Sequence, residues 1–281
     1  MSMVPLRTGV LVGSWPLGMP TDPVSLYATL PSLVEEAGFD SLFVGDHLFA
    51  AGPSVDALAL ASSLAARTTR ITIGTGVLQL ALREPVAAAK QAATIDCLSG
   101  GRFVLGVGVG GEFEAEWSAV GVPRTGRGSR LDETRPGGPP VWVGGRSDTA
   151  LARAARHQGW LAYASSPRRV RDSVQKLQSL GRDAADGFRV GVVLWTYVAA
   201  DRAAARTQIG RLLGRRHRQD FDRYVDAFCA VGTVDDVAAR VAEFRAAGAT
   251  DVFFNPQCPA DEFLDQVRCV AELASREEVP A

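Results

Sequence analysis

The chain has 281 residues, 47% of them hydrophobic, and a formal net charge of −1. This content supports a sizeable core and excludes a largely disordered chain, while the near-zero charge gives no overall argument for nucleic acid or an anionic membrane. The sequence shows no apolar run approaching the roughly 18 residues of a membrane span, no signal peptide, and four cysteines without metal-ligand spacing. We therefore expect a soluble cytoplasmic protein with reduced thiols and no metal.

Short β-branched runs alternate along the chain with longer Ala- and Leu-rich segments of helical period. The predicted strands are 8–13, 41–45, 70–77, the glycine-rich stretch within 100–112, 141–144, 160–163, 188–199 and 251–255. The predicted helices are 23–37, 55–66, 84–97, 114–120, 147–157, 167–180, segments through 227, 234–247 and 261–275.

Eight strand candidates, nearly all followed by helices, predict a parallel sheet. Eight such units in a chain near this length favour a single (β/α)8 TIM barrel domain over residues 1–281 rather than two doubly wound domains. The fourth unit is irregular, because its helix makes only two turns. A stretch rich in Arg, Gly and Pro follows from 124 to 140, with one possible helical turn near 130–134.

The glycine-rich strand loses its side chains at every second position, at Gly106, Gly108 and Gly110. Residues two apart share a face of a strand, so one face is bare and lets a ligand or another backbone approach closely. The stretch also matches the dinucleotide pattern G-x-G-x-x-G. That interpretation needs a full helix and a second strand ending in an acidic residue, and the sequence offers neither.

In such barrels the active site lies at the carboxyl ends of the strands, where Asp46-His47 follows the second strand. A histidine there can donate or accept a proton near neutral pH. The alternative is that Asp46 caps the next segment and His47 packs beside it. We interpret His157 as compensating a helix dipole and His217 as part of a solvated basic helix face.

Gly144, Gly145, Arg146 and Ser147 follow the fifth strand and bring backbone N–H groups, a guanidinium and a hydroxyl to a helix start. This combination suits a phosphate. The alternative is an ordinary turn in which Ser147 caps the helix and Arg146 points to solvent.

Several stretches together resemble the bacterial luciferase-like monooxygenase superfamily, in the right order along nearly the whole chain. They are EAGFDSLFVGDH (36–47), IGTGV (73–77), SGGRFVLGVG (99–108), RLDE (130–133) and PPVWVGG (139–145). The resemblance implies a (β/α)8 barrel that binds FMN or the deazaflavin F420 at the strand ends, and Asp46-His47 resembles the F420-using branch.

By this resemblance His47 is the proton donor or substrate polariser, and Asp46 is assigned to the catalytic site with it. A non-proline cis peptide between Gly76 and Val77 is expected to form a bulge behind the cofactor ring. The cofactor's side chain is expected near Gly108, Val109, Gly110, Gly111 and Glu112, and its phosphate near Gly144, Gly145, Arg146 and Ser147.

The chain departs from the family pattern after RLDE, where only five residues precede PPVWVGG. Relatives carry a full helix and a lid-like insertion there, so we expect a curtailed fourth helix and no substrate lid. The leading hypothesis is an F420-dependent oxidoreductase that moves a hydride to or from an unidentified small organic substrate. The alternatives are an FMN-dependent monooxygenase and a non-catalytic flavin- or F420-binding protein. We expect a homodimer and no nucleic-acid or membrane partner.

Overall fold

The computed structural model of the protein describes residues 4–13, 23–49, 54–110, 113–122, 138–217 and 219–274. The strands in these ranges are β1 (Arg7–Val12), β2 (Ser41–Val44), β3 (Thr72–Thr75), β4 (Leu78–Gln79), β5 (Phe103–Gly108), β6 (Val141–Gly144), β7 (Gly159–Tyr163), β8 (Arg189–Val198), β9 (Cys229–Gly232) and β10 (Asp251–Pro256). The α-helices are α1 (Pro23–Glu36), α2 (Ala57–Ala66), α3 (Pro85–Ser99), α4 (Glu114–Val120), α5 (Asp148–Ala154), α6 (Pro167–Ser179), α7 (Arg202–His217), α8 (Asp222–Phe228), α9 (Val234–Ala246) and α10 (Phe263–Ala274).

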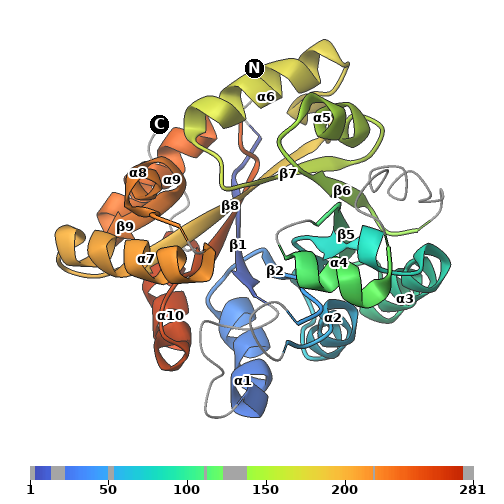
Figure 1. The fold of residues 1–281 in the computed structure, drawn as a ribbon, viewed down its shortest axis with the longest axis horizontal. Coiled ribbons are helices and arrows are strands. Elements are labelled where there is room, and N and C mark those ends of the chain that lie inside the picture. Colours follow the sequence, from blue (N-terminus) through green and yellow to red (C-terminus); the bar gives the residue numbers. More distant parts are fainter. Residues whose placement is uncertain are drawn as a thin grey trace.

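Eight parallel strands close into a barrel in the order β1, β2, β3, β5, β6, β7, β8 and β10, and β10 pairs back with β1. The helices lie around the outside of the strands (Figure 1). Successive parallel strands need long crossover connections, which the helices supply. The predicted (β/α)8 barrel is confirmed, and each predicted strand corresponds to one barrel strand.

Two short strands add to the predicted set. The predicted strand 70–77 stops at Thr75, and after an interruption at Gly76 and Val77 the chain pairs again with β5 as β4. The other addition is β9, which pairs with the end of β8 beyond the barrel. No element is predicted from the sequence there, because four apolar residues between helices are too few for a periodic signal.

The fourth unit keeps its predicted short helix, since α4 spans Glu114–Val120. Gly121 ends it in the left-handed conformation, with φ of 64°. The expected helical turn near 130–134 and the shortened region lie outside the described residues.

Large side chains fill the interior of the barrel. Phe43 from β2 and Phe253 from β10 have ring centroids 4.3 Å apart, and Trp142 from β6 lies 6.1 Å from Phe253. Glycines leave room for these rings, because a Cβ at Gly74 would lie 2.6 Å from the Phe43 ring. A ligand therefore has no space along the barrel axis, and a binding site must lie at one end of the barrel.

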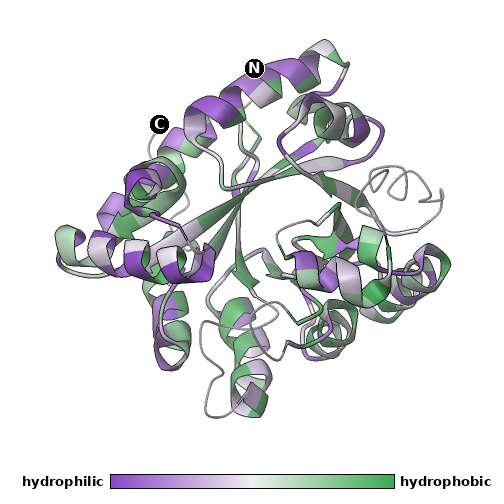
Figure 2. Ribbon diagram, viewed as in Figure 1, coloured by the Kyte–Doolittle hydropathy of each residue, from purple (hydrophilic) through white to green (hydrophobic). Residues whose placement is uncertain are grey.

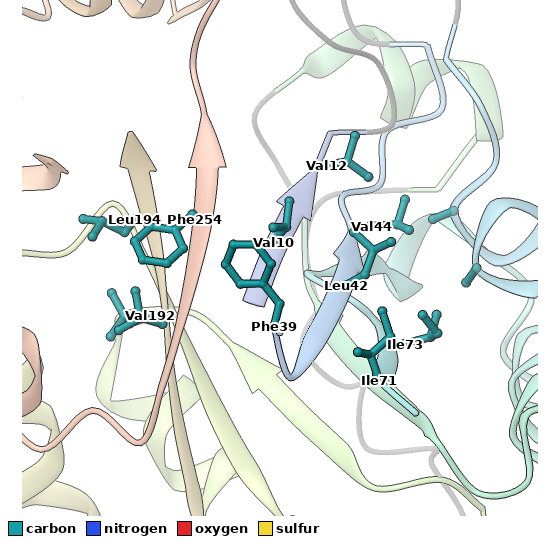
Figure 3. Packing of buried hydrophobic residues seen from close by; sticks show 14 of the residues in the cluster. Val10, Val12, Phe39, Leu42, Val44, Ile71, Ile73, Val192, Leu194 and Phe254 are labelled. Carbon is teal, nitrogen blue, oxygen red and sulfur yellow. The ribbon is translucent and has the colours of Figure 1, made fainter. Parts of the chain in front are cut away.

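Alternate residues of the same strands face outward into a second apolar layer beneath the helices. Leu11 of β1 and Phe253 of β10 face the barrel interior. Their neighbours Val10 and Phe254 face outward and pack in this layer with Phe39 (Figure 3). Figure 2 shows hydrophobic residues along the central strands and hydrophilic residues spread over the surrounding helices. Among the described residues no helix is long and apolar enough to cross a membrane.

Glu35 fastens the last turn of α1 to the segment that enters β3. Its carboxylate accepts backbone N–H groups from Thr69 at 3.0 Å, Arg70 at 2.5 Å and Ile71 at 3.1 Å, and the Thr69 hydroxyl at 3.2 Å. Desolvation acts to raise the pKa of Glu35, but these hydrogen bonds outweigh it and hold the pKa below its ordinary value. The carboxylate therefore stabilises the fold in its ionised form.

We expect Glu35→Gln to lower the free energy of unfolding at pH 7 by about 1–3 kcal/mol, because an amide places an N–H group against backbone donors. The lowered pKa makes the wild-type advantage complete above the unfolded pKa, near pH 4.3, and lost as the pH falls through the folded pKa. Urea unfolding of both proteins from pH 7 to pH 3 checks this. Glu36→Gln, at an exposed neighbour, is the control and should change stability by less than about 0.5 kcal/mol. A difference that stays constant with pH would contradict the assignment.

Candidate functional site

A cavity of about 610 Å³ lies at the carboxyl ends of the barrel strands. Its size is within the range of small-molecule sites. The strand ends contribute Leu11, Gly13, Gly45, Asp46, His47, Gly76, Val77, Gln79, Gly110, Arg146, Tyr163, Ala164, Trp195, Asn255, Pro256 and Gln257. The remaining lining residues come from the α7–α8 hairpin and the start of α10, and they are Arg216, His217, Gln219, Phe221, Tyr224, Phe228 and Phe263.

The structure brings together a subset of the site residues predicted from sequence. The cavity is lined by His47, Asp46, Gly76, Val77, Gly110 and Arg146. The same strand ends also carry five predicted residues that do not line the cavity, namely Gly108, Val109, Gly144, Gly145 and Ser147. The remaining two, Gly111 and Glu112, lie outside the described residues.

The peptide bond between Gly76 and Val77 is cis, as the family resemblance implies. Val77 occupies a slot between two predicted site glycines, since a Cβ at Gly108 would lie 2.5 Å from one Val77 methyl group and a Cβ at Gly144 2.9 Å from the other. A Cβ at Gly106 would overlap the backbone oxygen of Thr75. The bare face of the glycine-rich strand is therefore filled by the neighbouring strand and its bulge, and only Gly110 on that face lines the cavity.

Asp46 is buried and ion-paired at the end of β2. Its carboxylate lies 2.7 Å from Nη2 and 3.2 Å from Nε of Arg83, and accepts the Gln79 backbone N–H at 2.9 Å. It does not cap the following helix, because Asp56 is the N-cap of α2. Asp46 therefore fixes the segment that follows the Gly76–Val77 bulge.

Arg83 bridges Asp46 to Asp56, whose carboxylate lies 2.6 Å from Nη1. Desolvation acts to lower the pKa of Arg83, but the two carboxylates outweigh it and raise the pKa. Desolvation likewise acts to raise the pKa of Asp56, and hydrogen bonds from backbone N–H groups and Arg83 outweigh it and lower the pKa. Arg83 thus pairs with both carboxylates and joins the end of β2 and the segment after β4 to the start of α2.

His47 is held through its Nδ1 atom by Gln79 and Glu116, neither of which was predicted to be a catalytic or cofactor-binding residue. Nδ1 lies 3.2 Å from Oε2 of Glu116 and 2.9 Å from Nε2 of Gln79. Glu116 is 1% exposed, and its other oxygen accepts the backbone N–H groups of Leu48 at 2.6 Å and Phe49 at 3.1 Å. The short helix α4 thus places the Glu116 carboxylate against the segment that follows β2.

These two partners suit opposite protonation states of the imidazole. A protonated Nδ1 can donate to the Glu116 carboxylate, and an unprotonated Nδ1 can accept from the Gln79 amide. The Gln79 amide also donates to the backbone oxygen of Asp46 at 2.6 Å, which fixes its orientation. A ring with a partner in both states can gain and lose a proton without moving.

The sequence gives a weak indication of the position of Gln79 and of Glu116. Gln79 lies two residues after the predicted third strand, where site residues are expected, but its amide side chain carries no proton that would suggest a role in acid–base chemistry. Glu116 lies beside Trp117, a large apolar residue that is 2% exposed in the structure. The sequence of so short a helix does not show which of its residues are buried, so Glu116 was not distinguished from an exposed glutamate.

The prediction that His217 belongs to a solvated helix face is wrong. His217 lines the cavity, stacks on Phe221 with centroids 5.3 Å apart, and lies 5.6 Å from Trp195. The reason is that α7 ends at His217 and the chain turns back into α8, so the last turn of α7 faces the barrel mouth. His157 is outside the cavity, three residues after the end of α5.

The turn after β6 has the features of the ordinary turn that the sequence left as an alternative, and it also brings Arg146 to the cavity edge. Ser147 caps α5 by accepting the Ala150 N–H at 3.2 Å. Arg146 is exposed but lines the cavity edge, where Nη1 donates to the Ala164 oxygen at 3.0 Å. Arg169 from α6 donates to the Arg146 oxygen at 2.5 Å, so a second guanidinium is fastened beside the first. In the part of the chain that the structure describes, no cluster of His, Cys, Asp or Glu could hold a metal ion.

Comparison with known proteins agrees with this architecture. A family model described as luciferase-like monooxygenase matches residues 18–135 and 134–251. An F420-dependent glucose-6-phosphate dehydrogenase of Beutenbergia cavernae is 46% identical over 83 residues, covering 28% of this chain and 25% of that protein. A crystal structure of the monooxygenase RslO1 from Streptomyces bottropensis superposes with a TM-score of 0.79 at 22% identity, covering 95% of this chain and 98% of that one.

A 5,10-methylenetetrahydromethanopterin reductase of Methanolobus tindarius is 25% identical over 305 residues, covering 83% of this chain and 91% of that protein. This alignment is longer than the entire chain of 281 residues, so the relative carries segments that this chain lacks. The two family-model matches meet at residues 134 and 135, within the region that the sequence predicts to be shortened. Taken with the closed barrel and the cavity at its strand ends, the matches show that the chain belongs to the luciferase-like monooxygenase family.

Proposed function

We propose that the chain is an F420-dependent oxidoreductase that transfers a hydride between the deazaflavin and a small organic substrate. The observation that carries the proposal is His47 in the cavity wall, with Nδ1 between Glu116 and Gln79. Hydride transfer to or from a carbonyl group requires a matching proton transfer, which such a histidine performs. The relative from Beutenbergia cavernae that is named for F420 supports the same cofactor.

The cavity fits a flat ring. Four of its lining positions are glycines at the ends of β1, β2, β3 and β5, namely Gly13, Gly45, Gly76 and Gly110. A Cβ at Gly76 would lie 2.6 Å from Leu11, and a Cβ at Gly110 would overlap Gln79 Oε1. These two glycines therefore make room for Leu11 and Gln79, and their own backbone lines the cavity where a planar ligand can approach it. Gln79 Oε1 is buried without a hydrogen-bond partner in the structure, which a donor on a bound ring would supply.

In this proposal Gly76, Val77 and Gly110 support the cofactor ring, and the backbone at Gly108 and Val109 lies along its side chain. Gly144, Gly145, Arg146 and Ser147 hold its phosphate, because Arg146 at the cavity edge and the capped start of α5 both favour an anion.

A bound deazaflavin supplies or accepts the hydride. We assign the accompanying proton to Nε2 of His47, since Nδ1 is engaged by Glu116 and Gln79. With the exchange at Nε2, Nδ1 keeps its proton and donates it to the Glu116 carboxylate in both states, so Glu116 orients the ring throughout. Asp46 acts through the backbone of Gln79 and through Arg83, and is a positioning residue rather than a proton carrier.

Calorimetric titration with F420 and with FMN tests the cofactor. We expect F420 to bind at least tenfold more tightly than FMN, and Arg146→Ala to weaken F420 binding by about tenfold through loss of a charge-assisted contact. Arg168→Ala removes the same charge from an exposed position on α6 outside the cavity lining, so it is the matched control and should leave the affinity unchanged. Turnover is then measured with reduced F420 on a panel of ketones, aldehydes and conjugated alkenes.

Two other functions remain as outcomes of this experiment. Binding of FMN alone, with oxygen consumption when the flavin is reduced, would favour an FMN-dependent monooxygenase, and the family description names a monooxygenase. Cofactor binding without turnover on the panel would favour a non-catalytic binding protein.

The homodimer and the cytoplasmic location stay predictions. Val86 and Leu98 on α3 are strongly exposed and offer apolar surface that a second copy would cover.

A further inference from the structure

The proposed cofactor contacts and His47 account for only part of the cavity. The remaining wall comes from the ends of β7, β8 and β10 and from the α7–α8 hairpin. This wall has a composition unlike that of the cofactor side, because aromatic rings replace the glycines. We call it the hairpin wall and define it by Tyr163, Trp195, Arg216, Phe221, Tyr224 and Gln257.

The rings of the hairpin wall form a continuous series of contacts. Tyr163 meets Trp195 edge-on at 5.1 Å, and Trp195 lies 5.3 Å from Phe221. Phe221 lies 5.6 Å from Tyr224, which stacks on Phe228 at 5.6 Å with an interplanar angle of 8°. Trp195, Phe221, Tyr224 and Phe228 belong to an apolar cluster separate from the barrel core, and all five rings line the cavity. A series of rings along a cavity wall favours a flat conjugated ligand, since rings gain from stacked and edge-on contacts.

A cation is built into the same wall. Arg216 lines the cavity, and its Nη1 donates to Oε1 of Gln257 at a long 3.5 Å. Gln257, which is 2% exposed, donates in turn to the side chain of Asn255, and Asn255 donates to the Leu11 oxygen at 2.7 Å. Two buried amides thus connect the guanidinium at the end of α7 to β10 and β1. A guanidinium supported in this way is better positioned to bind an anion than the guanidinium of a solvated surface arginine.

From the ring series and the anchored guanidinium we infer that the substrate is a flat, conjugated organic acid. Its ring lies along Trp195, Phe221 and Tyr224, and its carboxylate pairs with Arg216. This inference rests on the proposed function, because it assigns the hairpin wall to the substrate and the glycine-lined wall to the cofactor. His217, stacked on Phe221 beside Trp195, completes the polar end of this subsite.

Binding of three small probes tests the inference without knowledge of the natural substrate. The probes are trans-cinnamate, its methyl ester, and 3-cyclohexylpropanoate, which keeps the acid but lacks the flat ring. Calorimetry should show trans-cinnamate binding at least about tenfold more tightly than either of the others. Absence of trans-cinnamate binding, or equal affinity for the acid and the ester, would overturn the inference.

Matched variants locate the binding. Arg216→Gln should weaken trans-cinnamate at least about tenfold and leave the affinity for the ester unchanged. Arg215→Gln removes the same charge from the exposed neighbouring residue and should have no effect. Tyr224→Leu keeps apolar bulk but removes a ring, and should reduce the preference for cinnamate over the cyclohexyl acid. If Arg216→Gln behaves like Arg215→Gln, the carboxylate does not bind at the hairpin wall.

F420 titration separates this inference from the proposed function. Protein saturated with F420 should still bind trans-cinnamate, since the two ligands use different walls. Displacement of cinnamate by F420 would overturn the subsite while supporting the cofactor. Binding of cinnamate in an Arg216-dependent manner without any F420 binding would support an acid site and overturn the proposed function.

Discussion

Replacing His47 with glutamine should lower turnover with reduced F420 by about 10²–10⁴-fold, while F420 affinity changes little. Glutamine is of similar size, and its amide can donate a hydrogen bond to Glu116 or accept one from Gln79. It cannot supply or take up the proton that the reaction requires. The loss should therefore fall on kcat, as expected for a group that acts in the transition state. Stopped-flow measurement of deazaflavin oxidation, with the best substrate from the panel, gives the rate directly.

His157→Gln is the matched control, since His157 is outside the cavity lining, after α5. Its turnover should equal that of the wild type.

Glu116→Gln tests whether Glu116 positions the His47 ring. The kcat should fall while the F420 dissociation constant stays unchanged, and Glu116→Asp should recover part of the loss. Wild-type kcat in His47→Gln would remove the histidine from the mechanism.

The fold was open to prediction because it is encoded redundantly. Each of eight units repeats the same change from β-branched to helical pattern, so errors at single boundaries do not alter the topology. Even the short α4 follows from two local signals, an acidic first turn and Gly121 after the last turn. By contrast β9 has no such support, since it is a four-residue strand that forms by pairing with the end of β8.

The site was predictable only where backbone position implies role. His47, Gly76 and Val77 were predicted at the barrel mouth because strand ends converge there, and all three line the cavity. The cis bond between Gly76 and Val77, which the family resemblance implies, is confirmed. The role of Gly108 could not be read from its spacing, because the group that fills its bare face is Val77 from another strand. Glu116 is positioned by the docking of α4, and His217 by the reversal of the chain after α7. Both are tertiary effects that the local pattern does not encode.

The SGGR portion of the glycine-rich motif has a structural role at the opposite end of the barrel from the cavity. Arg102 enters β5 and donates to the backbone oxygens of Ser99 at 2.9 Å, Ile71 at 2.8 Å, Ala65 at 3.1 Å and Thr68 at 2.9 Å. It also donates to the Thr68 hydroxyl at 3.0 Å. A single guanidinium thus satisfies carbonyl groups at the ends of α2 and α3 and on the segment that enters β3.

We expect Arg102→Met to lower the free energy of unfolding by about 3–5 kcal/mol, because the side chain keeps its apolar stem but several carbonyl groups lose their donor. Stability of a domain is about 5–15 kcal/mol, so the loss should lower Tm by roughly 10 °C. Differential scanning calorimetry and urea unfolding measure both quantities. Arg102→Lys should recover only part of the loss, since an ammonium group cannot reproduce the planar fork of donors.

Arg171→Met, on the exposed surface of α6, is the matched control and should change stability by less than about 0.5 kcal/mol. The site provides a second comparison, because Arg102 is far along the barrel from the strand ends that line the cavity. At temperatures where the variant remains folded, its F420 affinity should match that of the wild type. A large loss of F420 affinity in folded Arg102→Met would mean that the two ends of the barrel are coupled, and that the motif is more than a clamp on α2 and α3.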